Sequence, residues 1–520
     1  MRKAVLSCVL STALVATPAA HAHADAPQRH DGRFSAADLA TMRRYAADTW
    51  RSMRAMVDPR TGVPADKVTG DLRTRARVTS PTNIAAYVWS TLVARDLHLI
   101  GGSEAVLRIG RVLTALEKMT RDTPTGQYYN WYDPATLELV RVWPDNGDQV
   151  KPFASSVDNA WLAAALMMLR EATPAHAARA DRLARSMNFA AYYDAAARPD
   201  AGTGLLRGGF WPDRPDGCSI ETDYAGTGVK VYSTCHTYGA PAETRIATYV
   251  GIALGQLPRE HYFGIYRTFP DSGCDWAWQE QKPVGSWKRY LGVNVWQGTY
   301  GYRGMRYVPN WGGSMFEELM PDLVVPEAAW APKSWGRNHP VFVRAQIEHG
   351  LAEAKYGYWG FSPSNDPHGG YREYGVDPLG MDAAGYTSDK ERTGTDPGYE
   401  GCRPAQPEPA SYGDGVVTPH AAFLALPYAG RRALDNLAAL KRNFDSYGRG
   451  GFYDAVAVRS GVVSTYHLAL DQGMVMAALG NVLARDNLRR YFGGAEVEAR
   501  LRPVMELEEW DVVDTTTDRG

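Results

Sequence analysis

The chain has 520 residues, of which 45% are hydrophobic and 22% are charged, and its formal net charge at pH 7 is −2. This composition is typical of globular proteins and argues against a disordered or fibrous chain. Because 56 basic residues face 58 acidic ones, there is no basic surplus to neutralise phosphates, which argues against a nucleic-acid-binding protein. The length allows one large domain or several ordinary ones.

Residues 1–24 have the pattern of a secretory signal peptide. Arg2 and Lys3 precede an apolar stretch over residues 4–16, and Ala22-His23-Ala24 follows as a cleavage site. The apolar stretch is too short to span a bilayer comfortably, and no later run approaches the ~18 apolar residues that a membrane helix needs. We therefore predict a secreted protein, extracellular or in the cell envelope, whose mature chain is 25–520 and has no membrane span.

Helical periodicity dominates the mature chain. Apolar residues recur at i, i+3 and i+4 in segments rich in Ala, Leu and Arg. Ser35 and Asp38 have the spacing of a capping box, which marks a helix start. The periodicity predicts helices over residues 34–54, 83–99, 103–119, 157–172, 174–193, 243–257, 340–355, 419–444 and 466–492.

Long loops rich in Gly, Pro, Tyr, Trp and Asp separate these helices, over residues 127–149, 202–239, 290–322 and 356–418. Loops longer than about 15 residues are uncommon as mere connectors and are usually functional. No low-complexity linker divides the chain. We therefore predict one all-α domain in which paired helices form a ring and the long loops line a cleft at one end, although composition leaves a solenoid open.

Four cysteines, Cys218, Cys235, Cys274 and Cys402, remain once Cys8 is removed with the signal peptide. An even number in an exported protein suggests disulfides. We favour Cys218–Cys235, because both lie in one Gly- and Asp-rich stretch, which leaves Cys274 to pair with Cys402. The alternative of a zinc site is weak, because no C-x2-C spacing is present.

Seven short motifs occur in an order that resembles a known family. They are residues 80–89 (SPTNIAAYVW), 129–133 (YNWYD), 155–164 (SSVDNAWLAA), 311–317 (WGGSMFE) with Met320-Pro321, 359–362 (WGFS), 417–422 (VTPHAA) and 470–473 (LDQG). The set resembles the glucoamylase-like family of bacterial glycan enzymes, whose relatives include endo-β-1,2-glucanases and the cyclising domain of cyclic β-1,2-glucan synthases. The resemblance covers residues 40–490 in patches and implies an (α/α)6 toroid that acts on a glycosidic bond.

Glu317 is the candidate general acid. Glycoside cleavage needs a proton donor at the leaving oxygen and a second carboxylate. Apolar neighbours and the adjacent Glu318 would raise the pKa of the Glu317 carboxyl, as a general acid requires. The resemblance also places the family's cleft glutamate here. The alternative is a carboxylate that only satisfies free N–H groups at a helix start.

Asp471 is the candidate second carboxylate, and Asp158 is a third. Asp471 lies in an apolar helix start, where an acid must face a cleft or a partner. The resembling hydrolases carry Asp-Gln-Gly at this position. For both residues the alternative is a helix N-cap. Asp145 and Asp148 are alternates that serve equally well as turn formers.

The predicted sugar-binding residues combine flat rings, which stack on sugars, with polar groups that bind hydroxyls. For each ring, packing in the core is the alternative. His420 stands where the family often has Tyr, so it is either a substrate contact or a packed histidine. The predicted substrate-binding set is Tyr129, Asn130, Trp131, Tyr132, Asp145, Trp311, Trp359, Asp366, Tyr371 and His420.

We predict a secreted glycoside hydrolase that cleaves a glucan, and the resemblance implies β-1,2-glucan as the favoured substrate and inversion of the anomeric configuration. The alternatives are a transglycosylase, a hydrolase of another envelope polysaccharide, or a non-catalytic carbohydrate-binding protein. We predict no cofactor, metal or partner protein. The acidic stretch 377–402 could hold calcium, but its spacing is not that of an EF-hand and a solvated loop accounts for it.

Overall fold

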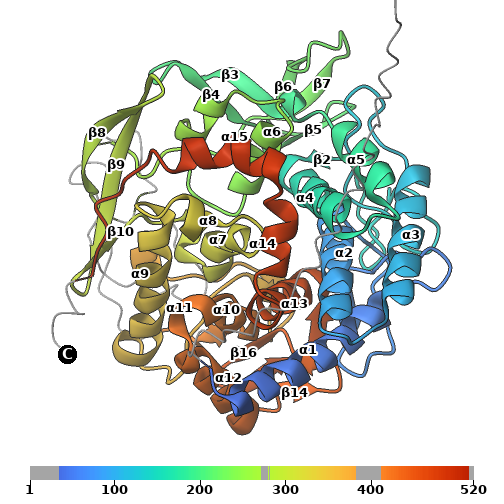
Figure 1. The fold of residues 1–520 in the computed structure, drawn as a ribbon, viewed down its shortest axis with the longest axis vertical. Helices are drawn as coiled ribbons and strands as arrows, with labels where there is room; N and C mark the ends of the chain where they lie inside the picture. The colour runs from blue at the N-terminus through green and yellow to red at the C-terminus, as the bar shows by residue number, and fades with distance from the viewer. Residues whose placement is uncertain (1–33, 271–278, 280, 382–411, 515–520) are drawn as a thin grey trace, which may run out of the picture.

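The computed structural model describes residues 34–270, 279, 281–381 and 412–514, and within them the chain is mostly helical (Figure 1). None of these helices is long and apolar enough to cross a bilayer. The helices are α1 (Ala36–Met56), α2 (Pro81–Asp96), α3 (Gly102–Lys118), α4 (Ser156–Ala172), α5 (Ala177–Arg185), α6 (Arg245–Ala253), α7 (Met315–Leu319), α8 (Glu327–Trp330), α9 (Trp335–Glu348), α10 (Pro419–Leu424), α11 (Leu426–Ala429), α12 (Arg431–Asn443), α13 (Ala469–Leu483), α14 (Asn487–Phe492) and α15 (Ala495–Met505).

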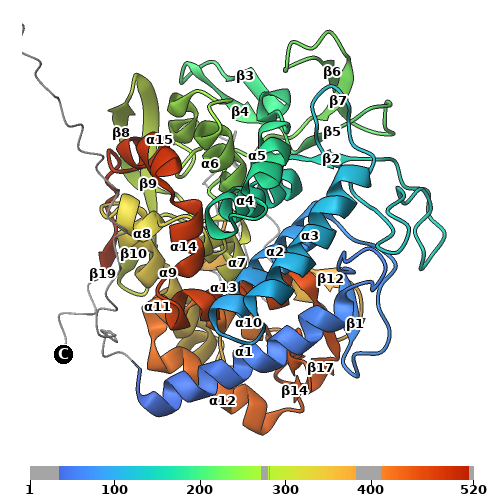
Figure 2. The same cartoon turned by 45° about the vertical axis from the view of Figure 1, so that its right-hand side comes forward.

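Six helices form a circuit of contacts in the middle of the molecule. Helix α2 packs against α4 and α13, α4 packs against α6, and α10 packs against α7 and α13. The side chain of Arg245 joins α6 to α7 through hydrogen bonds to main-chain carbonyls. Outside this circuit, α1 and α3 cover α2, α5 covers α4, α9 covers α7, and α12 covers α10 (Figures 1 and 2).

Position in the circuit explains the difference in sequence between inner and outer helices. In α2 every residue from Pro81 to Ala94 is buried, and α13 is buried from Ala469 to Asn481 except at Leu470. The outer helix α1 buries only one stripe, which includes Met42, Trp50 and Met53. A helix that is enclosed on all sides needs apolar residues all round, whereas a covering helix needs one apolar face.

Serine caps begin several of these helices, as the sequence predicts for α1. Ser35 and Asp38 form the complete capping box, with reciprocal hydrogen bonds. Ser80, Ser155 and Ser314 cap α2, α4 and α7 in the same way, each accepting the N–H of the residue three positions later. These caps fix the first turn of three inner helices, and that turn carries the candidate site.

Several small sheets correct the prediction of an all-α domain, because parts of the long loops form strands. The two four-stranded sheets have the orders β19-β10-β9-β8 and β2-β5-β7-β6. Alternating side chains in β9 place Val293, Val295, Gln297 and Thr299 on the buried face. The strands of these two sheets are β2 (Ala154–Ser155), β5 (Gly209–Trp211), β6 (Ser219–Thr222), β7 (Val231–Thr234), β8 (Val284–Tyr290), β9 (Val293–Tyr302), β10 (Met305–Tyr307) and β19 (Val513–Asp514).

The remaining strands form two- and three-stranded pieces at loop bases. They are β1 (Lys67–Thr69), β3 (Tyr193–Arg198), β4 (Thr203–Leu206), β11 (Ser364–Asn365), β12 (Tyr371–Arg372), β13 (Val416–Val417), β14 (Tyr447–Gly448), β15 (Gly451–Phe452), β16 (Ala455–Ala457), β17 (Val462–Ser464) and β18 (Tyr466–Leu468). The predicted helix 466–492 is wrong at its start, because 466–468 pair with β1. The predicted helix 419–444 breaks at Gly430, whose φ of 53° ends a helix.

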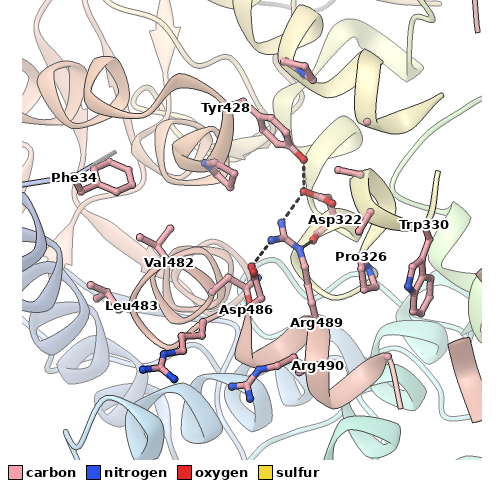
Figure 3. A pocket seen from close by; sticks show the side chains of 18 of the residues that line it. Phe34, Asp322, Pro326, Trp330, Tyr428, Val482, Leu483, Asp486, Arg489 and Arg490 are labelled. Atoms are coloured by element: carbon pink, nitrogen blue, oxygen red, sulfur yellow. Dashed lines mark hydrogen bonds and ion pairs between the residues drawn. The ribbon is translucent and has the colours of Figure 1, made fainter. Parts of the chain in front are cut away.

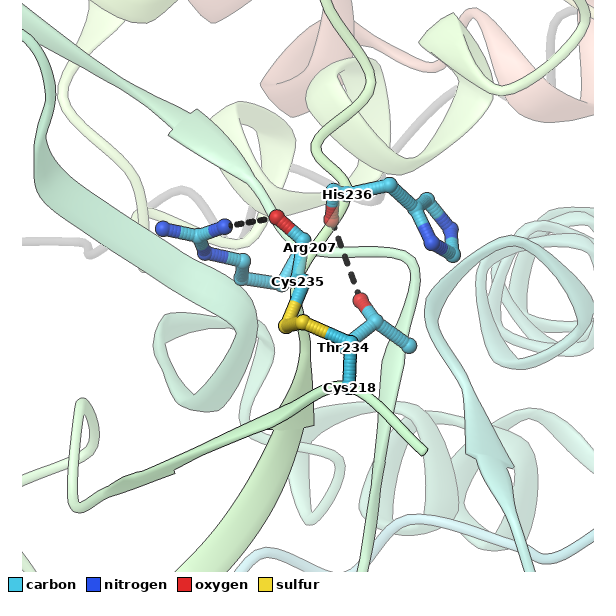
Figure 4. The surroundings of a disulfide bond; sticks show 5 residues. All are labelled: Arg207, Cys218, Thr234, Cys235 and His236. Carbon is cyan, nitrogen blue, oxygen red and sulfur yellow. Dashed lines mark hydrogen bonds between the residues drawn. A yellow bond between two sulfur atoms is a disulfide. The ribbon is translucent and has the colours of Figure 1, made fainter. Parts of the chain in front are cut away.

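The disulfide Cys218–Cys235 is present, which confirms the favoured pairing. It joins the residues that flank the antiparallel strands β6 and β7, with the two Cα atoms 5.8 Å apart (Figure 4). The backbone carbonyl of Cys235 also accepts a hydrogen bond from Arg207. Cys274 and Cys402 lie outside the described residues.

We expect peptide mapping of the secreted protein without reductant to find Cys218 linked to Cys235. The reason is that the hairpin already holds the two Cα atoms within the normal disulfide range of about 4.4–6.8 Å. Detection of both residues as alkylated free thiols in freshly isolated native protein would contradict this prediction.

Candidate active site

The three predicted catalytic acids occupy the same position in three inner helices. Asp158, Glu317 and Asp471 are each the third residue, of α4, α7 and α13 respectively. Ser155 and Ser314 accept the backbone N–H of Asp158 and Glu317, so these residues receive a cap and do not provide one. The helix-cap alternative is therefore wrong for Asp158, and also for Asp471, because Leu468 is the N-cap residue of α13.

The Glu317 carboxylate is half-buried and accepts the backbone N–H of Glu243 over 2.8 Å. The pKa of Glu317 is raised to about 7, chiefly by burial and also by the negative charge of Glu373, while the Glu243 N–H and Arg245 oppose the rise. A helix N-terminus also favours an ionised carboxylate by less than about 2 kcal/mol. Desolvation exceeds these opposing effects, so Glu317 can hold a proton near neutral pH.

Glu318 points away from Glu317 and into the core. It is fully buried, and one oxygen lies 2.7 Å from His339 Nδ1. The charge that raises the pKa of Glu317 comes from Glu373 and not from this sequence neighbour. The expected effect of Glu318 on the Glu317 pKa is thus wrong, because consecutive residues of a helix point in different directions.

Glu243, just before α6, is a site residue that the sequence analysis missed. It is buried, and its carboxylate accepts the indole N–H of Trp161 over 2.6 Å. Burial raises the pKa of Glu243 well above its ordinary value, and the charges of Glu317 and Asp158 add to the rise. The only signal in the sequence was an acid at a predicted helix start, and it does not reveal that Glu317 is adjacent.

Asp471 has a second acid, Asp454, as its neighbour. Both are about 1% exposed, and Asp454 accepts the backbone N–H of Asn365 over 2.6 Å. Burial raises the pKa of Asp454 to about 6, and burial followed by the charge of Asp454 raises that of Asp471 well above the ordinary value. Two adjacent buried carboxyls cannot both ionise easily, so the pair resists the loss of its second proton.

His420 lies beside this pair, with Nδ1 3.8 Å from an Asp471 oxygen. Burial lowers the pKa of His420 to about 3, so its imidazole is neutral. Ligand atoms of His420, Asp454 and Asp471 lie within 4.8 Å of one another and could in principle hold a cation. A shared proton accounts for the closeness of the two carboxyls without one.

Asp158 connects these acids to α2 and to a predicted sugar-binding residue. It accepts the hydroxyl of Thr82 over 2.6 Å and the side-chain amide of Asn130 over 3.1 Å. Asp66, which the sequence analysis missed, lies near it and accepts the amide of Asn83 over 2.9 Å. Burial raises the pKa of Asp66, and the charge of Asp158 is one of the causes that add to it.

The pKa of Tyr371 is affected by acids from both pairs. Its side chain is 52% exposed, yet the pKa of its hydroxyl is well above the ordinary value, through desolvation and then the charges of Asp471, Asp454 and Glu317. The charges of Glu317 and Asp471 thus both act on the Tyr371 hydroxyl, although each of the two acids has a different acidic neighbour.

The predicted aromatic platforms divide into two groups. Trp131 and Trp311 are partly exposed, and Trp131 packs edge-on against Trp143 with ring centroids 5.6 Å apart. Three of the predicted platforms are wrong, because their rings are buried in the core, namely Tyr129, Tyr132 and Trp359. The Tyr129 hydroxyl bonds Asp122, and that of Tyr132 bonds the main chain at Thr120.

Two predicted polar contacts also have local roles. Asp145 is exposed in a tight turn between Trp143 and Asp148. Asp366 is buried and accepts hydrogen bonds from the backbone of His368 and the hydroxyl of Tyr374. Asp366 therefore stabilises its own turn, as short acids commonly do, whereas Asp145 lies on the surface of its turn.

A separate pocket of about 810 Å³ lies at the other end of α13 from Asp471 (Figure 3). It is lined by Asn481, Val482 and Leu483 at the helix C-terminus, together with an ion-pair cluster. In that cluster Asp322 binds Arg489 over 2.8 Å and the hydroxyl of Tyr428 over 2.6 Å. Asp322 is therefore already paired with a cation and with a hydroxyl donor inside this cluster.

Comparisons with known proteins agree with this geometry. Residues 283–492, which include Glu317 and Asp471, match a family model described as "Putative glucoamylase". This part of the chain is therefore similar to the glucoamylase-like family. Residues 44–197 match a second model, described as "Protein of unknown function (DUF3131)". The resemblance seen in the sequence is thereby confirmed, and the two matched regions hold α4, α7 and α13.

The chain is also 23% identical over 571 residues to the cyclic beta-(1,2)-glucan synthase NdvB of Rhizobium meliloti (strain 1021), covering 87% of this chain and 18% of that protein. The chain thus spans less than a fifth of the length of this relative. Among solved structures, it is similar to an endo-beta-1,2-glucanase from Chitinophaga pinensis, with TM-score 0.60, 16% identity and coverage of 90% and 98%. A beta-1,2-glucanase from Parabacteroides distasonis gives TM-score 0.62, 15% identity and coverage of 91% and 60%. These likenesses show a shared fold.

We expect Glu317→Gln to stabilise the protein above pH 7. A folded-state pKa of about 7 against 4.5 means that the folded wild type loses stability as pH rises from about 4.5 to 7, by at most about 3 kcal/mol. Glutamine stays neutral, so the variant should gain that stability at pH 8 and match the wild type near pH 4. Urea unfolding at both pH values measures the difference.

Glu318→Gln is the matched control for this experiment. It changes the same side chain one position later but breaks a buried ion pair with His339, so it should destabilise the protein at pH 8. A Glu317→Gln variant that is no more stable than the wild type at pH 8 would contradict the raised pKa.

Proposed function

We propose that the protein is a glycoside hydrolase that cleaves a β-linked glucan, with β-1,2-glucan as the substrate to test first. The observation that carries the proposal is the Glu317 carboxyl, which lies in an acid-lined cleft and has its pKa raised to about 7. Enzymes raise a carboxyl pKa to this range when it must donate a proton to a leaving oxygen at neutral pH. The names of similar proteins, which act on or make β-1,2-glucan, support the choice of linkage.

In this proposal Glu317 protonates the glycosidic oxygen and the Asp471–Asp454 pair is the base. The pair holds one proton and one negative charge, so it can take a proton from water directly or through a sugar hydroxyl. Asp158, which already binds Thr82 and Asn130, orients the substrate. Attack by activated water on the face opposite the leaving group inverts the anomeric carbon.

The fold, the domain bounds, the secretion of the protein and its sugar-stacking surfaces are part of the same proposal. The circuit of α2, α4, α6, α7, α10 and α13 with its covering helices supports an (α/α)6 toroid. We propose that residues 25–520 form this one domain and that the protein is secreted after cleavage near Ala24. The partly exposed Trp131 and Trp311, with the exposed Tyr371, are the proposed stacking surfaces for sugar rings.

A second candidate rests on the contact between Glu317 and Glu243. The Glu317 carboxylate accepts the Glu243 N–H at 2.8 Å, and the two charges raise one another's energy. Retaining enzymes use two carboxyl groups only about 5–5.5 Å apart, one of them as a nucleophile. A glycosyl-enzyme formed in this way can pass its sugar to another sugar, which would make the protein a transglycosylase.

We expect Glu317→Gln to lose about 100- to 10,000-fold in kcat on β-1,2-glucan while it still binds sugar, because glutamine keeps the shape but has no transferable proton. Reducing-sugar release and calorimetric binding measure the two properties. A folded variant that keeps more than about a tenth of wild-type kcat would remove Glu317 from the acid role.

The stereochemistry of the first product separates the two mechanisms. Proton NMR during early turnover should show inversion, and Asp471→Asn should lose kcat more severely than Glu243→Gln. Retention together with an inactive Glu243→Gln variant would establish the second candidate. If the wild type binds glucans and releases no sugar from any of them, the protein is a non-catalytic carbohydrate-binding protein.

We expect a bell-shaped dependence of kcat/KM on pH. Activity should rise near pH 6 as the Asp454–Asp471 pair becomes a base, and fall near pH 7 as Glu317 loses its proton. Asp454→Asn removes the charge that raises the pKa of Asp471, so it should move the acid limb to lower pH and leave the alkaline limb in place. An unchanged acid limb in that variant would exclude the pair as the base.

A further inference from the structure

A cluster of four buried charges lies directly beneath Glu317. Arg245, Glu318, Glu327 and His339 are each at most 3% exposed. Arg245 binds Glu327 with two parallel hydrogen bonds of 2.7 and 2.9 Å. His339 lies 2.7 Å from Glu318 and 3.2 Å from Glu327. Its pKa is raised to about 9 by these two acids against the opposing effect of burial, so the cluster joins two cations, Arg245 and His339, to the acids Glu318 and Glu327.

Arg245 uses the rest of its guanidinium on the main chain around the cleft acids. Nη1 donates to the carbonyl oxygens of Glu317 and Ala242, each over 2.8 Å, and Nη2 donates to the carbonyl oxygen of Glu318 over 2.5 Å. All five N–H groups of this side chain thus have acceptors. Its face also lies 4.2 Å from the ring of Trp335.

These contacts join the two segments that carry Glu243 and Glu317. Helix α7 has only five residues, so its last carbonyls have no partner within the helix. Arg245 supplies that partner from α6, two residues after Glu243. The backbone N–H of Glu243 in turn donates to the Glu317 carboxylate. The buried side chain of Arg245 therefore fixes the separation of Glu243 and Glu317 from the core side.

We propose that Arg245, held by Glu327 and His339, is a positioning residue that sets the contact between Glu243 and Glu317. The proposal rests on the proposed function for its kinetic consequences but not for its structural ones. Lysine cannot reproduce the fork, because an ammonium is a point charge with three donors. Arg245→Lys should therefore loosen the Glu243–Glu317 contact while it keeps the charge balance.

Arg267→Lys is the matched control. Arg267 is equally buried and forms the same fork with Glu508, at 2.7 and 3.0 Å, and it also bonds main-chain carbonyls, yet it contacts neither α7 nor Glu243. Both variants lose a buried Arg–Glu fork, so both should melt at a lower temperature. Only Arg245→Lys should disturb the cleft.

The first readout needs no activity. Amide hydrogen exchange of peptides that contain residues 243 and 315–319 should speed up at least tenfold in Arg245→Lys and stay unchanged in Arg267→Lys, measured below both melting temperatures. The second is kinetic. A displacement of about 1 Å can cost about 100-fold in rate, so Arg245→Lys should lose about 100-fold in kcat with KM little changed, relative to Arg267→Lys.

A third variant removes charge without leaving a buried carboxylate unpaired. In Arg245→Gln with Glu327→Gln, loss of the guanidinium charge, which lowers the pKa of Glu317, should move the alkaline limb of kcat/KM to higher pH. Equal exchange in both lysine variants, or an unmoved limb in the double variant, would overturn the positioning role. A wild type without activity on any glycan would instead refute the proposed function, and the exchange result would still decide the role of Arg245.

Discussion

In this protein the pKa of a buried carboxyl group depends on whether a cation lies beside it, and the arrangement of the site follows from this difference. Glu243 lies beside Glu317 and Asp454 lies beside Asp471, and desolvation raises the pKa values of all four acids. Beneath the cleft, acids that are equally buried are paired with cations. Glu327, between Arg245 and His339, has its pKa lowered to about 2 despite complete burial. The same residue type thus holds a proton in one layer and a permanent charge in the next.

Two consecutive residues, Glu317 and Glu318, belong to different layers. Glu317 faces the cleft and Glu318 faces His339, because a turn of helix sends neighbouring side chains in different directions. Ser314 caps this turn and Arg245 binds its last carbonyls, so both ends of a five-residue helix are held. A helix this short has little stability of its own, and its geometry comes from these tertiary contacts.

The raised pKa values of the cleft acids lower the stability of the folded protein. A carboxyl whose pKa is raised by burial destabilises the folded state wherever it must ionise, which is the reverse of what Glu327 does. The paired cluster below has the opposite character, since each charge has a partner and breaking one pair leaves the other charge buried. The destabilised acids of the cleft thus lie on a rigid cluster in which every charge has a partner. Preorganised catalysis needs this arrangement.

The sequence alone determined the features that depend on near neighbours. The capping box at Ser35, most helix positions, the pairing of Cys218 with Cys235 and the candidate acids Glu317, Asp471 and Asp158 follow from spacing and local composition. Tertiary structure decided what depends on residues far apart in the chain. Glu243 and Asp454 are ordinary acids until folding brings them to Glu317 and Asp471, and Tyr129, Tyr132 and Trp359 have the composition of a sugar platform but are enclosed by the core. Periodicity records which face of a segment is buried, whereas a pKa depends on which charges lie nearby, and in this protein those charges come from α6, α7, α13 and the loop before β16.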